Sequence, residues 1–437
     1  MTDIIFAFDT EDFTSNLAAN AIKREADIMT VQGVTANFCL VGLLADQLIN
    51  WGRQDVLESL KPHEIQLHTL GHTLHPMLNE YTDIDDFYAA RDEVVRQETF
   101  ALEKIERATG TTSVAAAVPP GNQKSYVAMY AYADMGIPIL ADTLCDTVDG
   151  RGTFYCNIFN IDYVLGIENI LFKGNEESIK AELDKLTTRK RAVIYGHPHA
   201  SMFKEHWDVV NYDKENTYPF GQWESAELRD ASDIERFYEN LATIARLVRE
   251  DPRFRITTFG EISKELAARK QRRITAADIP SLREWIKDEL RPTDGEDSLS
   301  VADMFLACRD LLCGADEHIC GKTKGFLEAP RGITRPVTVS ADEMRASAES
   351  ISEKDFLPVR IWVNGKALGP ADWLYAAMAV LCGEETVTLT PTNQLLSLDI
   401  LPGVKNCSFK GTWRHSDDFE DKYLSDRLRL QCWTLRF

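Results

Sequence analysis

The feature that most constrains the fold is a regular alternation of short apolar runs with segments of helical spacing. Apolar runs of strand type lie within residues 4–8, 33–42 and 64–67. The segments between them, 16–29 and 43–60, repeat apolar residues at helical spacing. Strands that alternate with helices in this way are typical of a parallel α/β fold, and we expect that class here.

Acidic residues follow the first apolar run directly, at Asp9, Glu11 and Asp12. The carboxyl end of a strand is where α/β enzymes keep their chemistry. Because these carboxylates repel one another, they need a counter-charge, and a divalent cation supplies one. The alternative is an acid-rich helix N-terminus, which the helix dipole would favour.

Three histidines follow the third run, at positions 68, 72 and 75. Imidazoles four residues apart share one face of a helical turn, where both can bind one divalent ion. We therefore expect a short helical turn that presents His68 and His72 as ligands. The alternative is a pair of hydrogen-bonded loop histidines. His75 is a candidate for substrate contact, or it closes the loop before Pro76.

Three motifs in order resemble the polysaccharide deacetylase (NodB-homology, carbohydrate esterase family 4) superfamily. They are Phe8-Asp9-Thr10-Glu11-Asp12, Gly33-Val34-Thr35-Ala36-Asn37-Phe38 and His63-Glu64-Ile65-Gln66-Leu67-His68-Thr69-Leu70-Gly71-His72. The resemblance implies a distorted (β/α) barrel and metal-dependent removal of an acyl group, usually the N-acetyl group of a sugar. It makes Asp9 the general base and Glu11 the third metal ligand, with Asp12 as the competing choice.

The same chemistry can be argued without the family. A divalent ion held by one carboxylate and two imidazoles keeps open positions, polarises an amide carbonyl and lowers the pKa of bound water. An aspartate nearby that is not a ligand can then accept the proton of that water. The expected cofactor is a divalent metal, with zinc as the favoured ion.

The third motif of the superfamily is only partly present. An arginine that orients the base precedes its prolines, but Val118 or Ala117 occupies that position here. Pro119, Pro120 and Gly121 remain, so the resemblance implies an oxyanion-binding N–H at Gly121 and a substrate contact at Pro120. Asp9 must therefore find another partner or work with a different pKa.

Two later strand signals end in further candidates. Residues 137–142 end in Asp142, with Asp146 behind it, and residues 192–197 end in His197. By resemblance, His197 is the general acid that protonates the leaving amine, and Asp142 orients it. Asp142 can instead cap a turn, and His199 is a weaker candidate.

An aromatic segment, residues 203–223, follows that strand. Its rings, Trp207 and Tyr212 among them, can stack on sugars as substrate-binding residues. They can equally pack over the barrel.

Length, charge and cysteine content limit the number of domains, the partners and the compartment that we expect. A chain of 437 residues is too long for one compact core, and we expect a catalytic barrel over 1–272 and a smaller α+β accessory domain over 275–437. The formal charge of −21 disfavours nucleic acid and anionic membranes as partners. Nine scattered cysteines without a CxxC motif suit a reducing compartment. The sequence opens directly into a strand signal, so we expect a cytoplasmic protein unless a leader has been lost. The expected partners are a small-molecule or oligosaccharide substrate and a second copy of the chain in a homo-oligomer.

The accessory domain contains a repeated pattern. Residues 299–307 resemble residues 368–376, and each opens a helix with N-capping chemistry. The second copy faintly resembles pseudomurein-binding repeats, and a cover for the barrel or a dimer contact is the other reading.

The sequence therefore predicts a metal-dependent hydrolase of a carbon–nitrogen bond, acting on an N-acetylated amino sugar, oligosaccharide or polysaccharide. Two alternatives remain. One is a metal-independent, allantoinase-like cyclic-amide hydrolase of the same fold, suggested by the missing arginine. The other is an inactive carbohydrate-binding barrel.

Overall fold

The computed structural model covers residues 1–437 and describes all of them except 122, 146, 148, 214–215, 218–221, 296, 353–354, 410–414 and 416–418. For 212–213 and 216–217 it describes the backbone only. The chain forms two compact units. The first comprises Met1–Gly152, Ile158–Ala268 and Cys407–Tyr423, and the second comprises Thr153–Asn157, Arg269–Asn406 and Leu424–Phe437.

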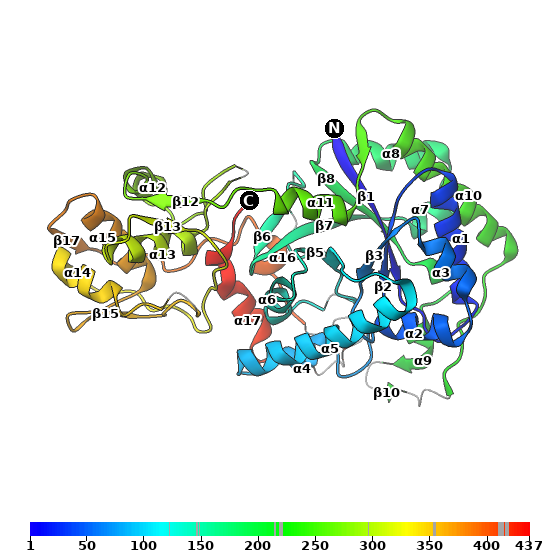
Figure 1. Cartoon of the computed structure of the whole chain (residues 1–437), viewed down its shortest axis with the longest axis horizontal. Helices are drawn as coiled ribbons and strands as arrows, with labels where there is room; N and C mark the ends of the chain where they lie inside the picture. Colours follow the sequence, from blue (N-terminus) through cyan, green and yellow to red (C-terminus); the bar gives the residue numbers. More distant parts are fainter. Residues whose placement is uncertain are drawn as a thin grey trace. The chain divides into compact units, whose positions relative to one another are not determined.

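The first unit is built on seven parallel strands that close into a ring. Figure 1 shows strands of this ring at the centre of the unit, with helices around them. Strand β8 pairs with β7 on one side and with β1 on the other, which closes the barrel. In ring order the strands are β1 (Thr2–Thr10), β2 (Asn37–Leu40), β3 (Glu64–Leu67), β4 (Ala116–Ala117), β5 (Ile139–Asp142), β7 (Ile158–Gly166) and β8 (Arg191–Gly196). A further parallel strand, β11 (Phe254–Ile256), pairs with β1 outside the ring. The predicted (β/α) barrel is confirmed.

Helices surround this barrel. They are α1 (Ala18–Val31), α2 (Gly42–Asn50), α3 (Gln54–Leu60), α4 (Leu78–Thr82), α5 (Phe87–Thr109), α6 (Tyr126–Asp134), α7 (Glu168–Lys173), α8 (Glu176–Leu186), α9 (Trp207–Asn211), α10 (Ala231–Glu250) and α11 (Phe259–Ala267). A 3₁₀ turn, η1 (Pro198–Ser201), follows β8, and a short hairpin pairs β9 (Tyr212–Asp213) with β10 (Asn216–Thr217). The single helix expected over 43–60 is wrong, because the chain breaks it into α2 and α3 at Gly52, whose φ is +66°.

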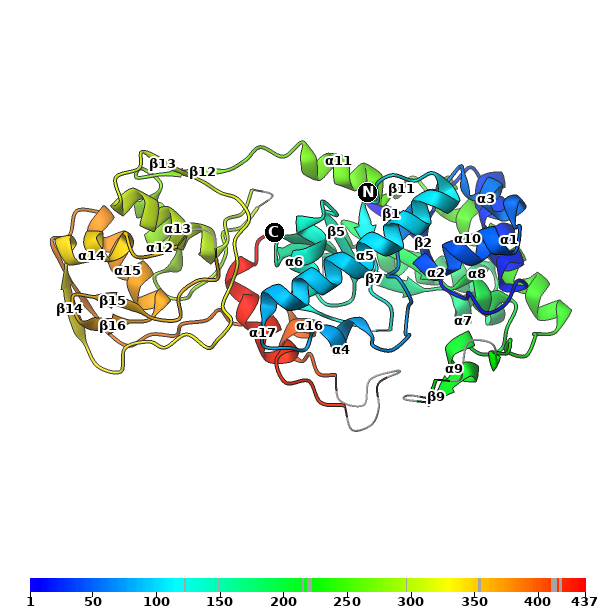
Figure 2. The same cartoon turned by 60° about the horizontal axis from the view of Figure 1, so that its bottom comes forward.

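Side-chain caps fix where several helices begin. The Asp86 carboxylate accepts from two backbone N–H groups at the start of α5, and Ser125 and Thr258 each cap the next helix in the same way. Helix α5 ends at Gly110, which takes the left-handed conformation that glycine adopts without strain. Both views show α5 lying along α2 and α6 (Figures 1 and 2).

The strand order explains the sequence pattern. Every residue of β1 is buried, because strands lie on both sides of it and the barrel interior and the helices cover its two faces. Such a strand reads as a continuous apolar run, and only its carboxyl end is free to carry polar groups.

The second unit consists of short helices with two-stranded sheets. Its elements are β6 (Thr153–Tyr155), β12 (Arg273–Thr275), α12 (Ile279–Ile286), α13 (Val301–Leu312), β13 (Glu317–Ile319), β14 (Val337–Ser340), α14 (Ala341–Ala348), β15 (Ile361–Val363), β16 (Lys366–Leu368), α15 (Pro370–Leu381), β17 (Thr386–Leu389), α16 (Pro402–Lys405), α17 (Leu424–Leu430) and η3 (Gln431–Thr434). Phe305, Trp373 and Trp433 form the centre of its core.

The repeated sequence pattern corresponds to α13 and α15, each followed by a strand, β13 or β17. Asp303 accepts from the backbone N–H of Ser300, and Asp372 accepts from that of Gly369, so both helices begin with the same capping contact.

The second unit begins close to the expected boundary at residue 275, but it also takes a segment from within the barrel sequence. The Tyr155 hydroxyl donates to the carbonyl of Leu428 at 2.6 Å, and Phe154 forms a bridge with Arg436. Conversely, residues 407–423 return to the first unit, where Asp83 accepts from the backbone N–H groups of Lys422 and Tyr423. In the described part of the chain, no helix is both long and apolar enough to span a membrane.

A buried carboxyl on α5 makes the stability of the protein depend on pH. Burial raises the pKa of Glu98 from 4.5 to about 8. Between these values the unfolded chain loses a proton that the folded chain keeps, so the free energy of unfolding falls as pH rises from about 4.5 to about 8. A shift of this size corresponds to roughly 3–5 kcal/mol.

We therefore expect the free energy of unfolding of Glu98→Gln, relative to that of the wild type, to rise by several kcal/mol between pH 5 and pH 9. Urea unfolding of both proteins at several pH values measures the difference. Glu93→Gln changes a partly exposed carboxylate of the same helix, one that pairs with Arg96, and as the control it should show no such gain. A constant difference between Glu98→Gln and wild type would mean that Glu98 is ionised in the folded chain.

Candidate active site

The carboxyl ends of the barrel strands bring the candidate residues together. Asp9 lies in β1 and Glu11 just after it, His68 follows β3, and His197 follows β8. Because parallel strands end at the same rim, these side chains meet in one pocket of about 310 Å³. The pocket is also lined by Pro120, Gly121, Asp142, Tyr163 and His206.

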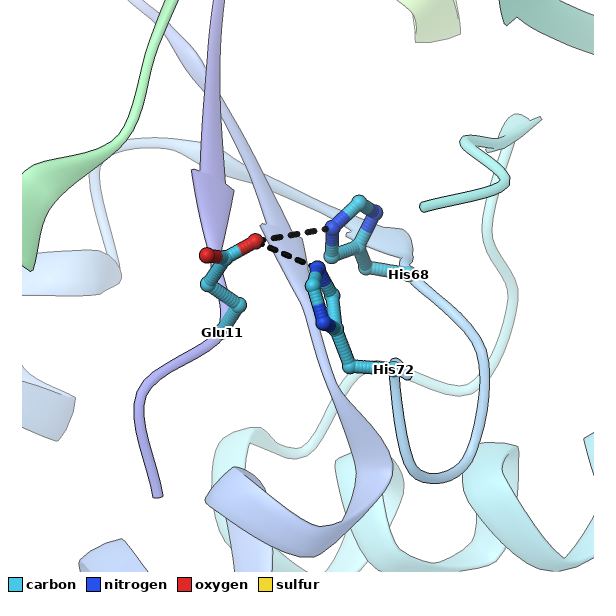
Figure 3. Close-up of side chains that lie close together, drawn as sticks. All are labelled: Glu11, His68 and His72. Atoms are coloured by element: carbon cyan, nitrogen blue, oxygen red, sulfur yellow. Dashed lines mark ion pairs between the residues drawn. The ribbon is translucent and has the colours of Figure 1, made fainter. Parts of the chain in front are cut away.

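Glu11 faces both predicted histidine ligands (Figure 3). Its Oε2 lies 2.5 Å from His72 Nε2 and 3.6 Å from His68 Nε2, and all three side chains are 2 % exposed. Figure 3 shows Glu11 just beyond the end of β1, with both imidazoles reaching it from the loop after β3.

The tautomers of the two imidazoles follow from their outer contacts. His68 Nδ1 lies 2.7 Å from the carbonyl of Val118, which can only accept, so Nδ1 carries the proton and Nε2 keeps its lone pair. His72 Nδ1 lies 3.1 Å from Thr73 Oγ1, and that hydroxyl donates to the buried Asp208 at 2.9 Å. The Thr73 oxygen can therefore accept a hydrogen bond from His72 Nδ1–H. The proton is then on Nδ1, and His72 Nε2 presents its lone pair to Glu11.

This donor set fits a divalent cation. Two imidazole lone pairs and a carboxylate oxygen converge in a buried space, and His68 Nε2 has no hydrogen-bond partner. Lone pairs this close repel unless a proton or a cation lies between them, and one carboxylate with two imidazoles is a ligand set that zinc accepts. Burial opposes ionisation of Glu11. When protons rather than a cation lie between Glu11 and the histidines, the charge of His72 and the hydrogen bonds of His206 and His68 hold the pKa of its carboxyl well below the usual value.

The loop that carries the histidines is not helical, so the expected helical turn is wrong. Thr69 and His72 have φ values of +63° and +56°, and the Thr69 hydroxyl accepts from the His72 backbone N–H. The first N–H groups of α2, at Gly42 and Leu43, donate to the carbonyls of Thr69 and Leu70 and hold the loop in place. The left-handed residues bring the two imidazoles together without a helix.

Asp12 does not face the imidazoles, so the alternative that Asp12 is the third metal ligand is wrong. Its carboxylate accepts from the Thr14 backbone N–H at 2.9 Å and from the Thr14 hydroxyl at 2.7 Å. Burial raises the pKa of Asp12 to about 6. In extended backbone, residues 9 and 11 point to one side and residue 12 to the other, so the alternation of the strand could have decided the question.

Asp9 has found a partner in place of the missing arginine. The Tyr163 hydroxyl donates to Asp9 Oδ1 at 2.9 Å, and the Tyr163 ring stacks on Tyr195 with centroids 4.5 Å apart. Asp9 Oδ2 lies 3.7 Å from His197 Nε2. Tyr163 comes from the middle of β7, and sequence reasoning missed it because no motif marks that strand.

His197 is oriented by Glu168, so the predicted role of Asp142 is wrong. Glu168 Oε1 accepts from His197 Nδ1 at 2.7 Å and from its backbone N–H at 2.9 Å. Burial lowers the pKa of His197, but the hydrogen bond and charge of Glu168 outweigh it and raise the pKa to about 10. Asp142 lines the pocket but accepts from the Thr143 backbone N–H, which is the turn-capping role. Asp146 lies outside the described residues.

A second group of histidines lies on the other side of Glu11. Glu11 Oε1 is 3.2 Å from His206 Nδ1 and 3.6 Å from His199 Nε2, and these two ring atoms are 2.9 Å apart. His199 was the weaker candidate in the sequence, and His206 was only part of the aromatic segment. Their proximity to residue 11 results from the return of the chain after η1.

The remaining predicted site residues divide into two groups. Pro120 and Gly121 line the pocket, and Gly121 has a φ of +56°. His75 does not line it, because the carboxylate of Glu80 binds its ring at 2.7 Å, which favours the loop-closing reading.

Trp207 supports the packing reading of the aromatic segment. It is 1 % exposed and contacts Phe13, with ring centroids 4.6 Å apart, so its faces are not open to a sugar. The side chain of Tyr212 lies outside the described residues, as do Tyr218 and Phe220.

No family model matches the chain, and neither does any curated protein. Among solved structures, a CE4 esterase from Streptococcus mutans matches at 14 % identity and a TM-score of 0.36, over 59 % of this chain and 85 % of that one. A CE4 family pseudoenzyme from Bacillus anthracis matches at 12 % identity and a TM-score of 0.35, over 60 % and 66 %. A 4-alpha-glucanotransferase from Thermococcus litoralis matches at 13 % identity and a TM-score of 0.43, over 62 % and 41 %. The first two belong to the superfamily that the sequence motifs resemble. Identities at this level leave the activity to be argued from the side chains.

Proposed function

We propose that the first unit is a metal-dependent hydrolase that removes an N-acetyl group from an amino sugar, an oligosaccharide or a polysaccharide. The observation that carries the proposal is that three kinds of group meet in one pocket. They are a carboxylate that is not a ligand, Asp9; a metal group of three donors, Glu11, His68 and His72; and a protonated imidazole, His197.

The metal group accounts for activation of an unreactive amide. A divalent ion, with zinc favoured, held by Glu11, His68 and His72 would supply Lewis acidity toward the carbonyl and toward a water molecule. The protein's part is to fix the donors. Val118 orients His68, and Asp208 orients His72 through Thr73.

Asp9 is the proposed general base. Its carboxylate is buried beside the metal group, and a neutral hydroxyl, Tyr163, binds one of its oxygens. It accepts the proton of the attacking water.

His197 is the proposed general acid. Glu168 fixes Nδ1, so Nε2–H points into the pocket on the side of Asp9. With its pKa raised, the imidazole is protonated at neutral pH and can donate to the leaving nitrogen. The proposed base and acid thus lie next to each other in the pocket.

Two further features bear on the substrate. The backbone N–H of Gly121, at the pocket wall, is the proposed donor to the oxygen on which negative charge develops. A volume of about 310 Å³ is at the lower end of ligand pockets, which suits one sugar residue or the end of a chain.

Acetate release tests the proposal. The full-length protein, loaded with zinc, is incubated with N-acetylglucosamine, its oligomers and an N-acetylated polysaccharide, and free acetate is measured. We expect release that stops when a chelator removes the metal and returns when zinc is restored.

Cyclic amides are tested in parallel, with and without chelator. Ring opening that persists without metal, in the absence of acetate release, would replace the proposal with the metal-independent hydrolase. A folded protein that binds sugars and releases nothing would instead be an inactive binding barrel.

A further inference from the structure

The two oxygens of Glu11 face two separate pairs of imidazoles. Oε2 faces His68 and His72, whereas Oε1 faces His199 and His206. Each oxygen and its pair of ring nitrogens form a group whose atoms all lie within 4.8 Å of one another. The proposed reaction needs only the first group, so the second has no role in it.

The second group has the spacing of a metal site. Ligands of a tetrahedral zinc ion lie about 2.0–2.1 Å from it, and therefore roughly 3.3 Å from one another. The three separations among Glu11 Oε1, His199 Nε2 and His206 Nδ1 are 2.9, 3.2 and 3.6 Å, which lie on both sides of that value. This triangle fits a tetrahedral ion more evenly than the first group, whose His72 nitrogen lies 2.5 Å from Glu11.

We propose that Glu11 bridges two divalent cations, the second of them held by His199, His206 and Oε1 of Glu11. This inference rests on the proposed function, because the two ions share Glu11. Carboxylate-bridged ions lie about 3.5–4 Å apart, a distance that one bridging carboxylate can span.

The surroundings suit the added charge and indicate the kind of ion. Asp9, which lines the same pocket as His206, and Asp208, which lies 4.0 Å from His72, are buried carboxylates, and their negative charge offsets that of a second dication. Imidazole donors favour zinc or another late first-row ion over magnesium or calcium. Because His206 lines the pocket, the second ion faces the substrate and binds one of its oxygens, such as a sugar hydroxyl.

Metal stoichiometry tests the inference without reference to activity. Metal-free full-length protein is dialysed against zinc and its metal content measured, and a parallel titration with Co²⁺ follows visible absorption. We expect two equivalents in wild type and one in His206→Ala, with one of the two Co²⁺ binding phases lost. His206 is 35 % exposed, so its removal leaves the core intact. His75→Ala, a change in the neighbouring histidine loop outside both groups, is the control and should keep two.

The outcomes separate this inference from the proposed function. A single equivalent in both wild type and His206→Ala overturns the second site and leaves the hydrolase in place. Two equivalents in His206→Ala also overturn it, because the second ion would then bind without His206. No metal in His206→Ala overturns it as well, because removing His206 would then cost both ions and not the second alone. No metal in wild type contradicts both the inference and the proposed function.

Discussion

Asp9→Asn is expected to lower kcat by about 10²- to 10⁴-fold while the metal content stays unchanged. Asparagine keeps the shape of the side chain and can still accept the hydrogen bond of Tyr163, but it cannot take a proton from water. The measurement pairs initial rates of acetate release with metal analysis of the same preparation.

Asp12→Asn is the matched control for this change. Asp12 is also buried, but its carboxylate binds Thr14 and does not line the pocket. The variant should therefore retain turnover. If Asp9→Asn turns over at the wild-type rate, another residue is the base. Equal losses in the two variants would point to disturbed folding of the end of β1.

Glu11→Gln is expected to abolish both metal binding and turnover. Its carboxylate is the one anionic donor in either of the two described groups, and a neutral amide cannot replace its charge. In wild type, zinc at 100 times its dissociation constant should add about 2.7 kcal/mol to the free energy of unfolding. The variant should show no such gain.

Thermal unfolding with and without zinc measures the effect, and metal analysis confirms it. His75→Ala, whose ring binds Glu80 and lies outside both groups, should keep the stabilisation by zinc. A zinc-dependent rise in Tm that survives in Glu11→Gln would show that the ion binds elsewhere in the chain.

The sequence predicts the part of the site that depends on strand ends. Asp9, His68 and His197 each lie at or next to the end of an apolar run, and parallel strands in a closed barrel bring such positions to one rim. The order and spacing of the motifs therefore predict both the barrel and its central donors.

The residues that the sequence does not predict reach the site by tertiary packing. Tyr163 comes from the middle of β7, near an irregularity in the pairing with β8, which no local pattern reveals. Glu168 opens α7, where an acid is also expected for the helix dipole alone. His206 depends on a loop that returns to Glu11 from 195 residues along the chain.

The interleaving of the two units has a consequence for biosynthesis. Because the first unit includes residues 407–423 and the second includes 153–157 and 424–437, neither is complete until nearly the whole chain has left the ribosome. The last contacts within each unit therefore form only after most of the chain has been synthesised. The barrel strands lie within residues 2–196, so they are synthesised long before residues 407–423, and the nascent barrel lacks its contacts with that segment until late in synthesis.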